Sequence, residues 1–104
     1  MAKVSAHNGH QLATVVASRP GKSADATFRW TLTSDGRVLR RLQSIRGRTH
    51  TTGYRLCFRV NLQVMAAVTD AALTFDERRE RATQLLSRAL HKDGMVQVTE
   101  PPPS

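Results

Sequence analysis

Hydrophobic and polar residues alternate without interruption over residues 26–33, and this pattern predicts a β-strand with one buried face. The turn signal Ser34-Asp35-Gly36 follows, in which the glycine suits a left-handed backbone position. A second alternating run continues to Ile45, so residues 26–45 are predicted to form a β-hairpin with one apolar side and one side of threonine and arginine. The expected register pairs apolar residues across the strands: Leu32 with Val38, and Phe28 with Leu42.

The second arm of this hairpin also fits a helix, because the apolar residues of 38–45 lie at helical spacing as well. Ser34 or Asp35 would cap that helix and Gly47 would end it. We favour the strand, since the turn residues and the cross-strand matches agree with it.

Other segments extend the predicted sheet. Residues 11–18 are rich in β-branched and small side chains and read as a strand, followed by a break at 19–23. Residues 54–64 alternate over six apolar positions, although this strand could end near Val60. Residues 65–73 fit either a short helix or a continued strand and turn, and residues 95–99 read as a short last strand.

The clearest helix is predicted for residues 74–92. Thr74 and Glu77 have the spacing of a capping box, and Gly94 is placed to end the helix. Its expected apolar stripe consists of Phe75, Ala82, Leu85, Leu86, Ala89 and Leu90. The fold predicted from these elements is α+β: an antiparallel sheet of three to five strands with one long C-terminal helix on its apolar face, a two-layer sandwich. We expect a single small domain over 1–100, with 1–10 as a flexible arm and 101–104 as a proline-rich tail.

The charge of the chain is strongly asymmetric. Sixteen Lys and Arg stand against eight Asp and Glu, a net charge of +8, and thirteen of the sixteen are arginine. Residues 1–60 contain eleven basic and only two acidic side chains. Because guanidinium groups bind phosphate in a bidentate manner, this distribution favours a polyanionic partner over the alternatives of a solubilising surface or a GC-rich genome.

The outward side of the sheet and the loop at 46–52 are the candidate interface. Five arginines on one strand face would repel each other unless phosphates or acids lie among them, and threonine hydroxyls could donate to phosphates as well. The predicted nucleic-acid-binding residues are Arg29, Arg37, Arg41, Arg46, Arg48, Arg55 and Arg59. The expected function is a small, non-enzymatic nucleic-acid-binding protein of bacterial, phage or plasmid type.

DNA is favoured over RNA as the partner. The aromatic residues are expected to face inward, and a binding surface without exposed aromatics favours duplex backbone contact over single-strand stacking. Those residues are Phe28, Trp30, Tyr54 and Phe58. The alternatives are a solvated sheet face, or a homodimer formed by sheet stacking in a protein-interaction or phage assembly factor.

Sequence motifs for catalysis are missing: the chain has no phosphate-cradling glycine loop, no metal-binding helix motif and no nucleophile elbow. A small toxin-like ribonuclease using His50, Tyr54, Arg55 and Arg59 is the enzymatic alternative. The histidines lack metal-ligand spacing, so neither a metal nor another cofactor is expected. The lone Cys57 and the absence of a signal peptide or a bilayer-length apolar run suggest a cytoplasmic protein without membrane association.

Overall fold

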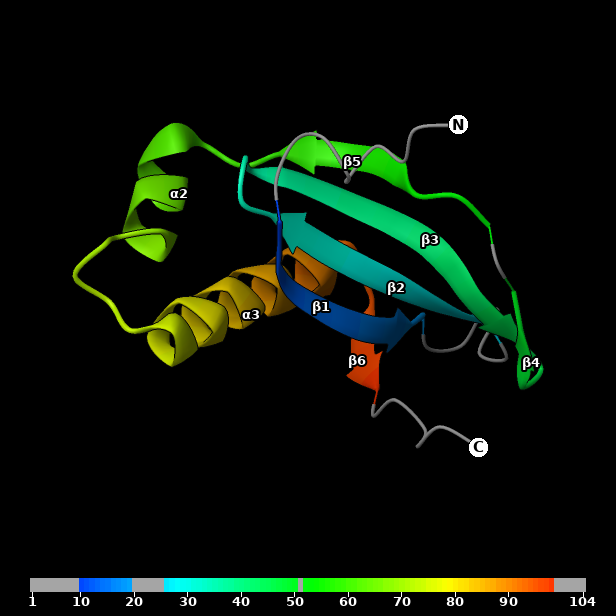
Figure 1. Ribbon diagram of the computed structural model, residues 1–104. Helices are drawn as coiled ribbons and strands as arrows, with labels where there is room; N and C mark the ends of the chain where they lie inside the picture. Colours follow the sequence, from blue (N-terminus) through cyan, green and yellow to red (C-terminus); the bar gives the residue numbers. More distant parts are fainter. Residues whose placement is uncertain (1–9, 20–25, 51, 99–104) are drawn as a thin grey trace.

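The computed structural model describes residues 10–19, 26–50 and 52–98, whose strands form one antiparallel sheet (Figure 1). The strands are β1 (Gln11–Ser18), β2 (Ala26–Thr33), β3 (Arg37–Ile45), β4 (Arg48–Thr49), β5 (Arg55–Arg59) and β6 (Val96–Val98). Their spatial order is β4-β3-β2-β1-β6, and β5 also pairs with β3. β4 and β5 occupy opposite ends of the same edge, because β4 pairs with residues 44–45 of β3 and β5 with residues 37–40.

The predicted hairpin is confirmed. β2 pairs with β3 in the expected register, Leu32 opposite Val38 and Phe28 opposite Leu42, and Gly36 adopts a φ of +88°. A Cβ at Gly36 would also lie 3.1 Å from the side chain of Met65, so both conformation and space favour glycine there. The alternative helix over 38–45 is wrong. The glycine turn before this segment and its pairing with β2 both favour a strand.

Helix α3 (Phe75–Lys92) covers part of one sheet face and confirms the predicted α+β sandwich. The Thr74 hydroxyl accepts a hydrogen bond from the Glu77 amide at 3.1 Å, and the Glu77 carboxylate accepts one from the Thr74 amide at 2.8 Å. Gly94 follows the helix with a φ of +78°. α3 packs along β1, β2 and β6 but makes few contacts with β3 and β5. The part of this sheet face that belongs to β3 and β5 is therefore not covered by α3.

The core lies between the sheet and the two helices. Its buried members are Ala13, Val15, Ala17, Trp30, Leu32, Val38, Met65, Val68, Ala82, Leu86, Leu90 and Met95. Phe75, which was expected in the apolar stripe of α3, is instead 64% exposed. It occupies the first residue of the helix, where the chain has not yet reached the sheet (Figure 1).

The strand predicted over 54–64 ends at Arg59, so its shorter version, ending near Val60, is confirmed and its extension to residue 64 is wrong. Helix α2 (Leu62–Val68) replaces the second half of the longer predicted strand. The Asn61 side chain caps this helix by accepting a hydrogen bond from the Gln63 amide at 2.7 Å. An asparagine cap supplies the acceptor that a new helix needs, whereas alternation alone does not reveal it. Among the described residues neither helix is long and apolar enough to cross a bilayer. The predicted tail, nearly all of the predicted arm and most of the break at 19–23 lie outside the described residues.

Candidate nucleic-acid interface

The threonine and arginine face of the sheet forms, but much of it is not open to a partner. Thr31 and Thr33 have no exposed surface, and Arg37 is only 4% exposed. The Thr31 hydroxyl donates to the Tyr54 hydroxyl at 3.4 Å, and the Thr27 and Ser44 hydroxyls are 2.6 Å apart. These threonines satisfy internal hydrogen bonds, so the expectation that they present their hydroxyls to phosphate is wrong.

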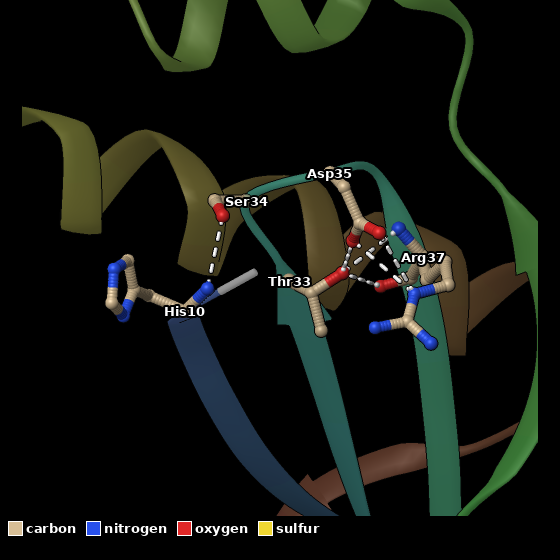
Figure 2. A network of polar contacts seen from close by, with 5 residues as sticks. All are labelled: His10, Thr33, Ser34, Asp35 and Arg37. Atoms are coloured by element: carbon tan, nitrogen blue, oxygen red, sulfur yellow. Dashed lines mark hydrogen bonds and ion pairs between the residues drawn. The ribbon is translucent and has the colours of Figure 1, made fainter. Parts of the chain in front are cut away.

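Arg37 belongs to the polar network of the β2–β3 turn (Figure 2). Its Nε lies 3.1 and 3.2 Å from the two carboxylate oxygens of Asp35, which also accepts a hydrogen bond from the Thr33 hydroxyl. Burial acts to raise the pKa of the Asp35 carboxyl, but hydrogen bonds from Thr33 and Arg37 and the Arg37 charge hold it below its usual value. Arg37 therefore stabilises the turn, and its buried position contradicts a role in surface contact.

Arg29 and Arg41 lie opposite each other on the face that α3 does not cover. Arg29 donates from Nε to the Gln43 side-chain oxygen at 3.0 Å. The Arg41 guanidinium stands 5.3 Å from the centre of the Tyr54 ring, and its buried Nε has no hydrogen-bond partner among the described residues. The Tyr54 ring thus stabilises the Arg41 guanidinium on this face.

A register shift in β5 reverses the predicted sides of its first residues. Phe58 pairs with Val38, but the next paired residues are Leu56 with Leu39 and Arg55 with Arg40, so Cys57 forms a bulge. Because paired residues share a face, Arg55 lies on the helix side of the sheet and Leu56 on the other side. The predicted outward position of Arg55 is therefore wrong, and all five residues of β5 are exposed.

The remaining predicted cations stand at the two ends of β3. Arg46 and Arg48 are exposed at the β3–β4 turn, where Arg46 has a φ of +51°, whereas Arg59 pairs with Arg37 at the other end. A nine-residue strand separates these ends by about 27 Å. The seven predicted arginines therefore extend along β3 and do not gather in one cluster.

A groove on the edge of β3, between β4 and β5, is lined by three arginines. This arginine groove has a volume of about 550 Å³ and is lined by Phe28, Arg40, Arg41, Leu42, Thr52, Gly53, Tyr54 and Arg55. None of these lining residues is acidic. Arg40 and Arg55 reach it from the helix side of the sheet and Arg41 from the other side, so the groove crosses the strand edge.

Arg40 was missed as a site residue because the alternation places it on the side expected to be apolar. Its guanidinium stands 5.2 Å from the Phe28 ring centre and 5.4 Å from that of Trp30, and such ring contacts stabilise a cation there. Its Nη1 is also 3.8 Å from the Asp93 carboxylate, which lies 3.6 Å from Arg19 as well. The Arg40-Arg41 dipeptide was the available signal, since adjacent strand residues present one charge to each face.

A second groove adjoins the first and shares Arg40 and Arg55 with it. This aromatic groove, of about 730 Å³, lies between β5 and the C-terminal end of α3. Its lining residues are Trp30, Arg40, Arg55, Leu56, Cys57, Phe58, Ala89, Lys92 and Asp93. Partial burial raises the pKa of the Cys57 thiol, which lowers the thiolate fraction at neutral pH.

The residues of the ribonuclease alternative are not assembled in one place. Tyr54 and Arg55 line the arginine groove, but His50 and Arg59 line neither groove. The described residues contain no group of three or more His, Cys, Asp or Glu that could hold a metal ion. No family model matches the chain, and no curated protein or solved structure is significantly similar to it.

Proposed function

We propose that this chain is a non-enzymatic nucleic-acid-binding protein that holds the phosphate backbone in the arginine groove. The observation that supports the proposal is that Arg40, Arg41 and Arg55 line one groove, and that no acidic side chain is among its described lining residues. Like charges that line one groove repel each other, and a bound phosphate reduces that repulsion while accepting bidentate hydrogen bonds. The weak, exposed pair between Arg40 and Asp93 leaves this cation available to a stronger partner.

The exposed cations outside the groove extend this surface along the edge of β3. Arg48 lies beyond one end of the groove and Arg59 beyond the other, each on a short strand paired with β3. A nucleic-acid backbone that follows the strand edge would meet these cations in turn. With about five phosphate contacts, log Kd should change with log salt at a slope near 3.5 for a single strand and 4 to 5 for duplex DNA.

The test is the double variant Arg41→Gln/Arg55→Gln, measured by fluorescence anisotropy with labelled oligonucleotides over a salt series. Two lost phosphate contacts should weaken binding at least tenfold and reduce the salt slope by about 1.5. The matched control is Arg78→Gln/Arg79→Gln, which removes the same charge from the first turns of α3, outside both grooves. A flat salt response, or equal losses for the two variants, would contradict the proposal.

Self-association is the second candidate function, favoured by large exposed apolar side chains near the two helix starts. Leu62 is 84% exposed, Phe75 64% and Val64 43%. Such residues are frequent at protein interfaces when they form a continuous patch. Light scattering of protein freed from nucleic acid by a high-salt wash distinguishes the two functions: an oligomer that does not bind oligonucleotides supports self-association. The lone Cys57 agrees with either function in a reducing cytoplasm.

A further inference from the structure

The arginine groove and the aromatic groove meet at Arg40 and Arg55, and their chemistry is complementary. One is lined by three arginines, whereas the other combines apolar side chains with Lys92 and Asp93. We propose that the bound nucleic acid is single-stranded and places an unpaired base in the aromatic groove while its phosphate lies in the arginine groove. This inference rests on the proposed function and specifies its substrate.

The aromatic groove offers an accessible ring for stacking. Phe58 is 41% exposed and Leu56 50%, although both were expected to be buried. Aromatic faces stack on any base, whereas the bases of a duplex are already stacked and show only their edges. The earlier preference for a duplex depended on the aromatic residues being in the core, and the exposure of Phe58 removes that reason.

The size and polar groups of the aromatic groove also suit a base. A volume of about 730 Å³ falls within the usual range for small-ligand sites. The Lys92 ammonium is a donor and the Asp93 carboxylate an acceptor, so both kinds of base-edge atoms can find a partner.

Trp30 is a second aromatic residue of this groove, and it contains a buried donor. This residue lines the aromatic groove and is 2% exposed, and its Nε1 donor has no acceptor among the described residues. Buried donors are normally paired. The Arg40 guanidinium stands over the indole ring, so a shift of Arg40 toward a bound phosphate would uncover the face of the ring for a base.

The experiment uses the full chain and three probes of equal length, about 12 nucleotides, at one salt concentration. The probes are oligothymidylate, a blunt DNA duplex and an abasic deoxyribose-phosphate oligomer. Oligothymidylate should bind about tenfold tighter than the other two, since one stacked base contributes on the order of this factor. Trp30 is the only tryptophan of the chain, so its emission should change with oligothymidylate and not with the abasic oligomer.

Phe58→Leu supplies the matching variant, because leucine keeps an apolar side chain on β5 but has no ring. It should lose about tenfold in affinity for oligothymidylate and nothing for the abasic oligomer. Phe75→Leu is the control: its exposed ring, with Arg79 at 5.7 Å, lies on α3 outside both grooves. Circular dichroism establishes that both variants fold.

The outcomes separate this inference from the proposed function. Equal or tighter binding of the duplex, equal binding of the abasic oligomer, or an unchanged affinity in Phe58→Leu overturns the single-strand inference. Salt-dependent binding in those cases leaves the proposed function standing. Failure of all three probes to bind overturns the proposed function itself.

Discussion

Arg37 and Arg40 lie three residues apart on β3, yet their surroundings give them different roles. Arg37 is buried and contacts the Asp35 carboxylate through Nε. Arg40 is half-buried, stacked over two aromatic rings and near an exposed carboxylate. The first arrangement stabilises the turn, and the second leaves a cation at the meeting point of two grooves.

We expect Asp35→Ala to lower the free energy of unfolding by about 2 kcal/mol, because the buried Arg37 guanidinium loses its contact with the Asp35 carboxylate. Urea unfolding at pH 7 measures this change. Glu80→Ala removes a carboxylate from the exposed side of α3 and should change stability by less than about 0.5 kcal/mol. Equal effects of the two substitutions would contradict the role assigned to the turn network.

The same carboxylate predicts a pH dependence. Because the folded-state pKa of Asp35 lies below its unfolded value, the ionised group contributes stability above the unfolded pKa of about 3.9. That contribution is lost as the pH falls through the folded-state pKa. Wild-type protein should therefore lose more stability between about pH 5 and pH 2 than Asp35→Ala, as followed by urea unfolding. Parallel stability curves would show that Asp35 does not titrate as proposed.

At the residue scale, the sequence predicted the sheet face of these arginines correctly, but it did not predict which of them are exposed to a partner. Alternation assigned Arg29, Arg37 and Arg41 to the face opposite the helix, and the pairing of β2 and β3 confirms this for Arg29 and Arg41. The exposure of Arg37 could not be deduced from alternation, because Arg37 is held in the polar network of the β2–β3 turn. The accessibility of Arg40 depends on how far α3 extends over the sheet, which no local pattern reveals.

At the scale of elements, the sequence predicts best where two independent signals coincide. β2 and β3 combine alternation with a glycine turn, and α3 combines an apolar stripe with a capping box, and all three were predicted closely. The segment after Arg59 has alternation alone, and the chain there forms α2 instead. The bulge at Cys57 shifts the register by one residue and so exchanges the sheet faces of Arg55 and Leu56. The amino-acid pattern of β5 does not indicate this shift.

The capping box of α3 allows a direct test of one such signal. Thr74→Ala removes the acceptor for the Glu77 amide and should cost about 1 kcal/mol of stability. Thr83→Ala makes the same substitution in the helix interior, where the hydroxyl bonds the Arg79 carbonyl at 2.8 Å, and should be neutral or slightly stabilising. Urea unfolding followed by far-UV circular dichroism compares the two. A larger loss of stability for Thr83→Ala than for Thr74→Ala would contradict the stabilising role assigned to the capping box.

At the scale of the whole molecule, charge is divided between the layers. None of the described strands contains an acidic residue, whereas β2 to β5 contain seven arginines. The described carboxylates lie at the β2–β3 turn, on or before α3, and at its end. Such a division creates a positive potential over the sheet edge that attracts a polyanion from a distance.

This division predicts that the two kinds of arginine affect different rate constants. Arg48 and Arg59 are exposed and line neither groove, so Arg48→Gln/Arg59→Gln should mainly lower the association rate and its salt dependence. Arg41→Gln/Arg55→Gln removes contacts within a groove and should mainly raise the dissociation rate. Stopped-flow measurement with labelled oligothymidylate separates the two constants. If both variants change only the dissociation rate, the outer cations contact phosphate directly, and the nucleic acid then follows the full edge of β3.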